Sequence, residues 1–136
     1  MSYGVASALQ AAVYQQLYTD PAVSALVGPH VFDALPTGPV PPLYVALGAE
    51  RVRDASDQSG GGAWHDLQIS VVTQNAGFAD AKRAAGAVSD ALAGAELTLS
   101  RGVLVSLNFL RASAARIGTG DSRRIDLIFR ARICDS

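Results

Sequence analysis

Two histidines, His30 and His65, are the imidazole side chains that could serve as a general base in this chain of 136 residues. A nucleophile needs such a base within hydrogen-bond reach, and neither histidine has a candidate partner at a suitable spacing. His65 precedes Asp66, but adjacent residues on a strand point to opposite faces, so the two form no ready-made dyad. We therefore expect surface histidines, or polar residues with satisfied hydrogen bonds, and no catalytic residue.

The carboxylates, the cysteine and the glycine run offer no further chemistry. Asp54 and Asp57 fall in a segment that we expect to be mobile, which cannot hold an acid and a base in fixed geometry. Cys134 is the single cysteine and has no cysteine or histidine at ligand spacing. The three glycines at 60–62 lack the lysine and the following helix of a phosphate-binding loop. We expect neither a metal nor another cofactor.

Arginine is the residue type whose placement suggests a function. Residues 1–96 carry four basic and nine acidic side chains, whereas residues 97–136 carry seven arginines against three aspartates. Acidic and basic surfaces on one chain suit head-to-tail self-association, in which different patches meet and a ring closes. A basic two-stranded ribbon could also touch phosphates, but the net charge is −1 and no aromatic residues interleave for base stacking. We therefore favour a contact between subunits.

The N-terminal part of the chain predicts two helices. Residues 3–19 place Val5, Leu9, Val13 and Leu17 on one helical face, with Ser2 as a possible N-cap. Asp20-Pro21 then ends this helix and begins a short second one, with aspartate at the N-cap and proline at the first helical position.

The middle of the chain predicts extended structure. A short extended stretch at 30–33 is followed by a proline-rich segment, 35–42, that we expect to lie along the surface. Strands are predicted at 43–52 and 64–75. Between them, Arg51 to Ala63 has four charges, three consecutive glycines and little to bury, so we expect a long flexible loop.

A helix and three strands are predicted to complete the chain. The helix runs from Phe78 to about Ala93, opened by Gly77 and capped by Gly94, with a narrow, alanine-rich apolar stripe. The strands fall at 97–99, 103–116 and 123–134, and the last two should form an antiparallel hairpin. In the last strand, Ile125 to Ile133 alternate with mostly charged residues.

These elements predict one α+β domain over residues 1–136: a mainly antiparallel sheet with two longer helices packed on one face. The apolar share of 49% suits a chain with a real core. No apolar run is long enough for a membrane span, and the N-terminus has no charged region typical of a signal peptide. We expect a single domain that stays in the cytoplasm where it is made, with no membrane partner.

In this order and spacing, the segments resemble a known family. ALQAAVYQQLYTDPAVSALVGPHVFDALP, then PPLYVALGAE, then WHDLQISVVTQNAGFADAKRAAGAVSDAL are similar to small tail-completion proteins of siphophages and prophages. The likeness is strongest to the tail terminator in gene transfer agents of alphaproteobacteria, phage-derived particles that carry host DNA. It covers nearly the whole chain.

The resemblance implies a structural function without catalytic residues. Tail terminators form a hexameric ring on the head-proximal end of the tail tube, which stops tube polymerisation and meets the head-side connector. Its partners would be further copies of itself, the major tail tube protein and the connector or stopper. DNA would pass through the lumen, and the ring would sit at the head–tail junction of a particle assembled in the bacterial cytoplasm.

The candidate interface combines the mobile segment with the arginine hairpin. The loop could order against the tube or a neighbouring subunit, and the arginines could meet the acidic part of the next copy. The candidate residues are Arg51, Arg53, Asp54, Asp57, Gly60, Gly61, Gly62, Arg111, Arg116, Arg124, Arg130 and Arg132.

Three other functions remain open from the sequence. The chain could be the head-side stopper or adaptor, which is also a small ring-forming protein. It could be a small hydrolase that uses His65 and Asp66. It could also be a module that binds a peptide along a sheet edge.

Overall fold

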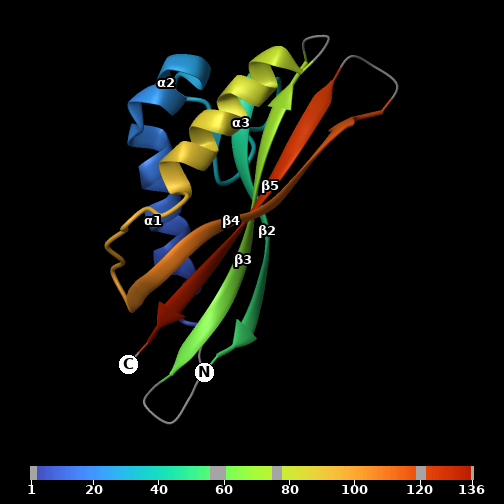
Figure 1. The fold of residues 1–136 in the computed structure, drawn as a ribbon. Coiled ribbons are helices and arrows are strands. Elements are labelled where there is room, and N and C mark those ends of the chain that lie inside the picture. The colour runs from blue at the N-terminus through green and yellow to red at the C-terminus, as the bar shows by residue number, and fades with distance from the viewer. Residues whose placement is uncertain (1–2, 56–60, 75–77, 119–121, 136) are drawn as a thin grey trace.

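The computed structural model describes residues 3–55, 61–74, 78–118 and 122–135. Its elements, in chain order, are α1 (Ala6–Thr19), α2 (Pro21–Val27), β1 (Val31–Phe32), β2 (Leu43–Asp54), β3 (Gly62–Thr73), α3 (Ala79–Leu92), β4 (Val103–Arg116) and β5 (Arg123–Cys134). Helices and a sheet form two layers, with the helices on one face of a twisted sheet (Figure 1). The predicted α+β class is confirmed.

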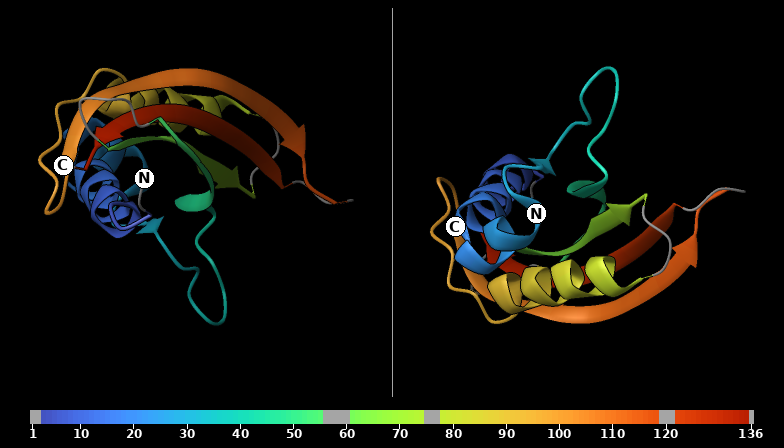
Figure 2. Two further views of the ribbon diagram at one scale, coloured as in Figure 1. Left: turned by 90° about the horizontal axis from the view of Figure 1, so that it is seen from below. Right: turned by 90° about the horizontal axis from the view of Figure 1, so that it is seen from above.

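The sheet has the strand order β1-β2-β3-β5-β4. The short β1 is parallel to β2, and the other neighbouring strands are antiparallel. The predicted hairpin of the last two strands is therefore present, with β4 at one edge of the sheet. The opposite edge is formed by β2 and, over two residues, by β1. Figure 2 shows the sheet curving past the helices, which leave much of β4 uncovered.

Local sequence signals account for the helices. Asp20 accepts a hydrogen bond from the Val23 amide at 3.0 Å, and Pro21 takes the first helical position of α2, as expected. α1 begins at Ala6, later than predicted, and Val5 precedes it without a side-chain cap. The proposed cap Ser2 and the helix-opening Gly77 lie outside the described residues.

The core lies between the helices and the inner face of the sheet. The alternating residues of β5 are buried as predicted, and Phe129 is fully buried. The alanine-rich stripe of α3 is buried as well, because small side chains let this helix pack closely on the sheet. Phe109 of β4 meets the Phe129 ring edge-on, with centroids 5.9 Å apart.

The predicted long loop is wrong at both ends. Arg51–Asp54 continue β2, and Gly62 and Ala63 begin β3; these two segments pair with each other, with Arg53 opposite Trp64. The pairing gives both segments backbone hydrogen bonds. These stabilise the strands more than the weak strand propensity of charged residues and glycine destabilises them. β2 ends at Asp54 and β3 begins at Gly62; of the residues between them, 56–60 lie outside the described part.

The predicted strand at 97–99 is also wrong. Leu97 and Leu99 pack against the core, while Glu96, Thr98 and Ser100 are exposed, which produces a strand-like alternation. The segment nevertheless has no strand structure. Both edges of β5 are occupied, by β3 and by β4, and the segment crosses between α3 and β4 as an irregular connection.

Candidate interaction surface

Six arginines lie on the sheet face that points away from the helices. Paired residues on neighbouring strands share a face, and the pairings place one set of charged side chains opposite the core. On this outward face lie Arg51, Arg53, Arg111, Arg124, Arg130 and Arg132, together with Asp66 and Asp126. Six arginines against two aspartates leave an excess of four positive charges on the described part of these strands. We call this surface the arginine face.

Register shifts in β2 and β4 affect which arginines reach the arginine face. In β2, Leu47 pairs with Ile69 but Glu50 pairs with Leu67, so one extra residue shifts the register. In β4, a similar shift occurs between Phe109 and Arg111. Because side chains alternate along a strand, one inserted residue moves every later side chain to the other face. Arg51 and Arg53 thereby point outward; in an unbroken alternation from Leu47 they would point toward the helices. β4 has a second shift, between Leu104 and Ser106, and the two shifts together leave Arg111 on the face opposite Leu104.

Trp64 is the centre of the arginine face. Its ring lies near three guanidinium groups, with distances from the guanidinium carbon to the ring centroid of 5.7 Å for Arg53, 6.0 Å for Arg130 and 5.5 Å for Arg132. The negative face of an indole ring attracts cations and contributes about 0.5–1 kcal/mol for each partly exposed contact. These contacts hold like-charged side chains close together.

Arg130 is neutralised within the chain. Its Nε and Nη2 donate to the two carboxylate oxygens of Asp66 at 2.8 Å and 3.0 Å. The hydrogen bond from Arg130, supported by the positive charges of Arg53 and Arg111, lowers the pKa of Asp66 below its ordinary value. Asp66 therefore stays ionised at neutral pH, and its negative charge offsets part of the positive charge of Arg130, Arg53 and Arg111.

Arg132 is also engaged, through two carbonyl oxygens. It donates to the carbonyls of Ile133 at 3.0 Å and Ala55 at 2.9 Å. Its guanidinium occupies the space where a Cβ of residue 62 would stand. Gly62 thus leaves room for a packed arginine, a function that the predicted flexibility of the glycine run did not include.

The remaining candidate residues are spread around this centre. Arg124 binds Asp126 at 3.1 Å, and Asp126 accepts a hydrogen bond from Ser70 at 2.6 Å. Arg51 and Arg111 make no side-chain hydrogen bond to any described residue. Arg116 pairs with Arg123, whose side chain faces α3, so it lies outside the arginine face.

The last candidate residues lie at the end of β2 and between β2 and β3. Asp54 ends β2 on the helix side, opposite Ala63. The Gly61 carbonyl accepts a hydrogen bond from the Asp135 amide at 3.1 Å. Asp57 and Gly60 lie outside the described residues.

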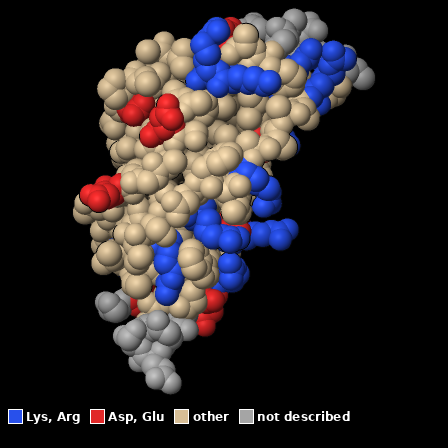
Figure 3. Space-filling model, viewed as in Figure 1, with Lys and Arg blue, Asp and Glu red and all other residues tan. Residues whose placement is uncertain are grey.

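Acidic side chains are more frequent on the helical side of the molecule and arginines on the arginine face, although Lys82 and Arg83 stand on α3. Figure 3 shows red side chains along the left, helical side and blue ones mainly at the right, over the strands, with a second blue group at the upper end. This separation follows the two layers of the fold. The sequence showed an acidic and a basic part of the chain, and the fold turns that difference into two surfaces.

His65 is buried, and sequence reasoning missed its partner. Its side chain has no solvent exposure, and Nδ1 lies 3.1 Å from a carboxylate oxygen of Glu50. The other oxygen of Glu50 accepts a hydrogen bond from the Tyr3 hydroxyl at 2.9 Å, which raises the pKa of Tyr3. The bulge in β2 turns Glu50 inward, so an unbroken alternation could not reveal this pair.

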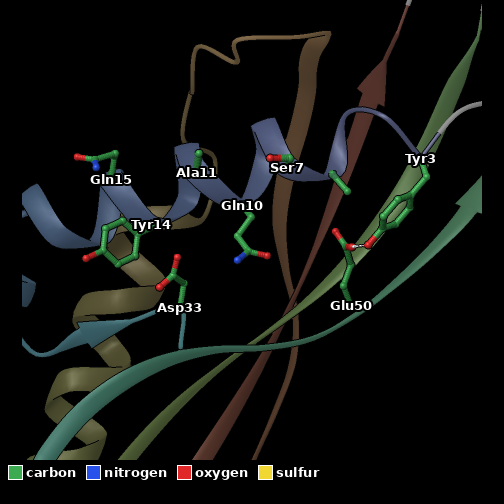
Figure 4. Close-up of a pocket in the computed structure, with 9 residues that line it drawn as sticks. Tyr3, Ser7, Gln10, Ala11, Tyr14, Gln15, Asp33 and Glu50 are labelled. Carbon is green, nitrogen blue, oxygen red and sulfur yellow. Dashed lines mark hydrogen bonds between the residues drawn. The ribbon is translucent and has the colours of Figure 1, made fainter. Parts of the chain in front are cut away.

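An open groove lies above this network. It has a volume of about 430 Å³ and runs between α1 and β1–β2, lined by Tyr3, Gln10, Tyr14, Asp33 and Glu50 among others (Figure 4). Its wall has two carboxylates and no described lysine or arginine. The groove presents hydrogen-bonding groups, but none of them is paired as a nucleophile with a base.

The geometry does not support catalysis by His65 and Asp66. The two side chains lie on opposite faces of β3; one is buried against Glu50 and the other is held by Arg130. Among the described residues, no three His, Cys, Asp or Glu side chains gather as metal ligands. Within the same part of the chain, the helices are too short or too polar to cross a bilayer.

The fold is thus an α+β sheet-and-helix domain whose outward sheet face carries a cluster of arginines. The sequence model of the family described as tail completion protein gp17 matches residues 11–134. The chain belongs to this tail completion family, whose members are structural proteins and not enzymes.

A solved structure gives a second comparison. A chain from the structure described as the virion of a native gene transfer agent particle is 63% identical, with a TM-score of 0.93. The match covers 98% of this chain and 99% of the other. Comparison with curated proteins finds no match. The predicted family is therefore confirmed.

Proposed function

We propose that this protein is the tail terminator of a phage-like particle, either a gene transfer agent or a siphophage. Copies form a ring, expected to be a hexamer, on the head-proximal end of the tail tube. The ring ends tube polymerisation and joins the tail to the head-side connector, and DNA passes through its lumen. The observation that carries this proposal is the likeness along nearly the full length to a chain of a gene transfer agent virion.

The arginine face supports a function in assembly. An excess of positive charge on one surface lowers the stability of an isolated chain through self-repulsion, and an acidic partner relieves it. In a ring of identical copies, each chain presents one surface to the copy before it and another to the copy after it. We infer that the arginine face of one copy meets the acidic helical side of the next.

The test combines mass in solution with imaging. The purified chain should have the mass of a closed oligomer, and negative-stain images should show rings with a central hole of tail-tube width. Cells that produce the particle without this protein should make tails of uncontrolled length that do not join heads. A chain that stays monomeric, and whose loss leaves tail length unchanged, would overturn the proposal.

The head-side stopper or adaptor is the second candidate, because it is also a small ring-forming protein. The two differ in the partner that they bind first. A terminator should pull down the major tail tube protein from lysates that contain no heads. A stopper should instead remain on DNA-filled heads in a strain that makes no tails.

A further inference from the structure

A proline-rich loop leaves the body of the molecule at one sheet edge. Residues 33–42 connect β1 to β2, and positions 33–39 are all exposed. The loop carries Leu35, whose exposed fraction is 53%, four prolines and a single charge, Asp33. Figure 2 shows it projecting well beyond the rest of the fold. An apolar loop held away from its own core buries little within the chain and is available for a partner.

An apolar groove is open at the opposite edge. It has a volume of about 300 Å³ and lies between α3 and the hairpin of β4 and β5. Its floor includes Phe109, Ala112 and Leu127, and Gly86 of α3 forms part of its wall. A Cβ added at Gly86 would meet no atom within 4 Å, so the groove is open at this point. The helices cover the inner face of the other strands but leave side chains on the inner face of β4, such as Phe109 and Ala112, exposed.

The loop and the groove cannot meet within one chain. β1 and β2 form one edge of the sheet and β4 forms the other, and Figure 2 shows the loop and β4 on opposite sides of the molecule. A contact between them must join two copies through different surfaces, which is the head-to-tail arrangement that a ring requires. The charges agree, because Asp33 stands at the base of the loop and Lys82 lines the groove.

We propose that the loop at 33–42 of one copy docks in the groove between α3 and β4 of the next copy. This inference rests on the proposed ring and names the contact that closes it. Leu35 and the neighbouring prolines fill the apolar floor, and Asp33 approaches Lys82. Proline restricts the free loop, so less conformational entropy is lost when it is ordered by docking.

Two variants test the contact from its two sides. Leu35→Asp places a charge on the loop, and Leu26→Asp makes the same substitution at an exposed leucine of α2, outside the loop, as its control. Gly86→Phe fills the groove from α3, and Arg83→Phe adds the same ring on the exposed side of that helix. We expect Leu35→Asp and Gly86→Phe to weaken subunit association about tenfold or more, while each control keeps the ring. Gly86→Phe should still fold with an unchanged or higher Tm, because glycine is the poorer helix former.

Mixing the two variants gives a sharper result. The Leu35→Asp chain keeps an intact groove and the Gly86→Phe chain keeps an intact loop, so an equimolar mixture should form dimers and nothing larger. A chain with Leu35→Cys, Gly86→Cys and Cys134→Ala should form a disulfide-linked ladder under mild oxidation. The chains with only one of the two introduced cysteines should give at most dimers.

The outcomes separate this inference from the proposed function. If the parent chain forms rings and both variants keep them, the docking contact is wrong and the ring stands. If rings persist but the Leu35→Asp chain no longer binds the tail tube protein, the loop contacts the tail tube protein and not the next copy, and the inference is again overturned. A parent chain that forms no ring and does not affect tail length removes the proposed function itself.

Discussion

Asp66 shows how single residues hold the arginine face together. It accepts two hydrogen bonds from Arg130 and lies near two further arginines, so its carboxylate is most useful when ionised. Its pKa is lowered in the folded chain, which means that folding favours the charged form. The stabilisation is therefore present above the pKa of the unfolded chain and is lost as the pH falls through the lower, folded value.

Replacement of this carboxylate gives a prediction with a defined pH dependence. Asp66→Asn should lower the free energy of unfolding by about 1 kcal/mol at pH 7, since the ion pair is only partly exposed. The difference from the parent chain should shrink below about pH 4, where the unfolded parent chain binds a proton at this carboxylate, and vanish once the pH has fallen through the lower pKa of the folded chain. Urea unfolding at pH 7 and pH 3, followed by Trp64 fluorescence, measures both values.

The control is a carboxylate in an exposed pair. Asp80 pairs with Arg83 one helical turn away, and both side chains are largely exposed. Asp80→Asn should change stability by little at either pH. A difference for Asp66→Asn that stays constant from pH 7 to pH 3 would contradict the assigned role of the charge.

At the scale of the elements, the bulge of β2 decides which side chains face the core. Gly48 and Ala49 together stand opposite Gln68, so the strand carries one residue more than its partner. After the bulge, Glu50 and Val52 point toward the helices, and Arg51 and Arg53 point outward. The bulge therefore sets both the buried His65–Glu50 pair and the arginine face.

Removal of both residues of the bulge should disrupt both features. Deletion of Gly48 and Ala49 together places Glu50 opposite Gln68, which would turn Arg51 and Arg53 toward the core and Val52 toward solvent. Deletion of Ala49 alone restores one-to-one pairing and keeps these side chains on their present faces. Unpaired buried charge is strongly unfavourable, so we expect the double deletion to cause a loss of several kcal/mol, or failure to fold. Chemical unfolding and circular dichroism measure the effect.

A substitution of equal length separates the register from the side chain. Ala49→Ser keeps the bulge and changes only an exposed side chain, so its stability should stay within about 0.5 kcal/mol of the parent. A double-deletion variant as stable as Ala49→Ser would show that the strand tolerates either register.

At the scale of the whole molecule, the separation of charge predicts salt-dependent assembly. Arg51 and Arg111 lie on the arginine face without hydrogen bonds to described residues, so they are available to a partner. Arg130 and Arg132 are engaged within the chain, and their reversal would disturb the fold as well as any contact. The first pair is therefore the better place to test the contact between copies.

Charge reversal at this pair should weaken the ring. We expect Arg51→Glu combined with Arg111→Glu to reduce subunit affinity about ten- to thirtyfold at low salt, at roughly 1 kcal/mol for each exposed pair. The difference should narrow as salt rises, because exposed charges are screened. Mass in solution across a salt series measures this.

A matched double reversal away from the arginine face serves as the control. Arg83→Glu with Arg116→Glu makes the same change in net charge. It should not weaken the ring at any salt concentration, because Arg83 stands on the helical side that is proposed to meet the arginines, where added negative charge is favourable. Equal weakening by both pairs would indicate an effect of net charge and would contradict a specific contact.

Much of the fold follows from local patterns in the sequence. Alternation in Ile125 to Ile133 specified the buried face of β5, and the spacing of small residues specified the buried stripe of α3. Asp20-Pro21 specified the start of α2. In each case the signal and the structure lie within a few residues of each other, so one segment contains the information.

The sequence by itself determined the α+β class, the surplus of arginine near the C-terminus and the family likeness. It did not show that Arg51 and Arg53 belong with the C-terminal arginines, or that Glu50 reaches His65. Only the tertiary structure decided these, because a bulge arises from the pairing of two strands and a single strand carries no mark of its partner's register. For the same reason, only the fold shows a projecting apolar loop and an open apolar groove at opposite edges of the sheet.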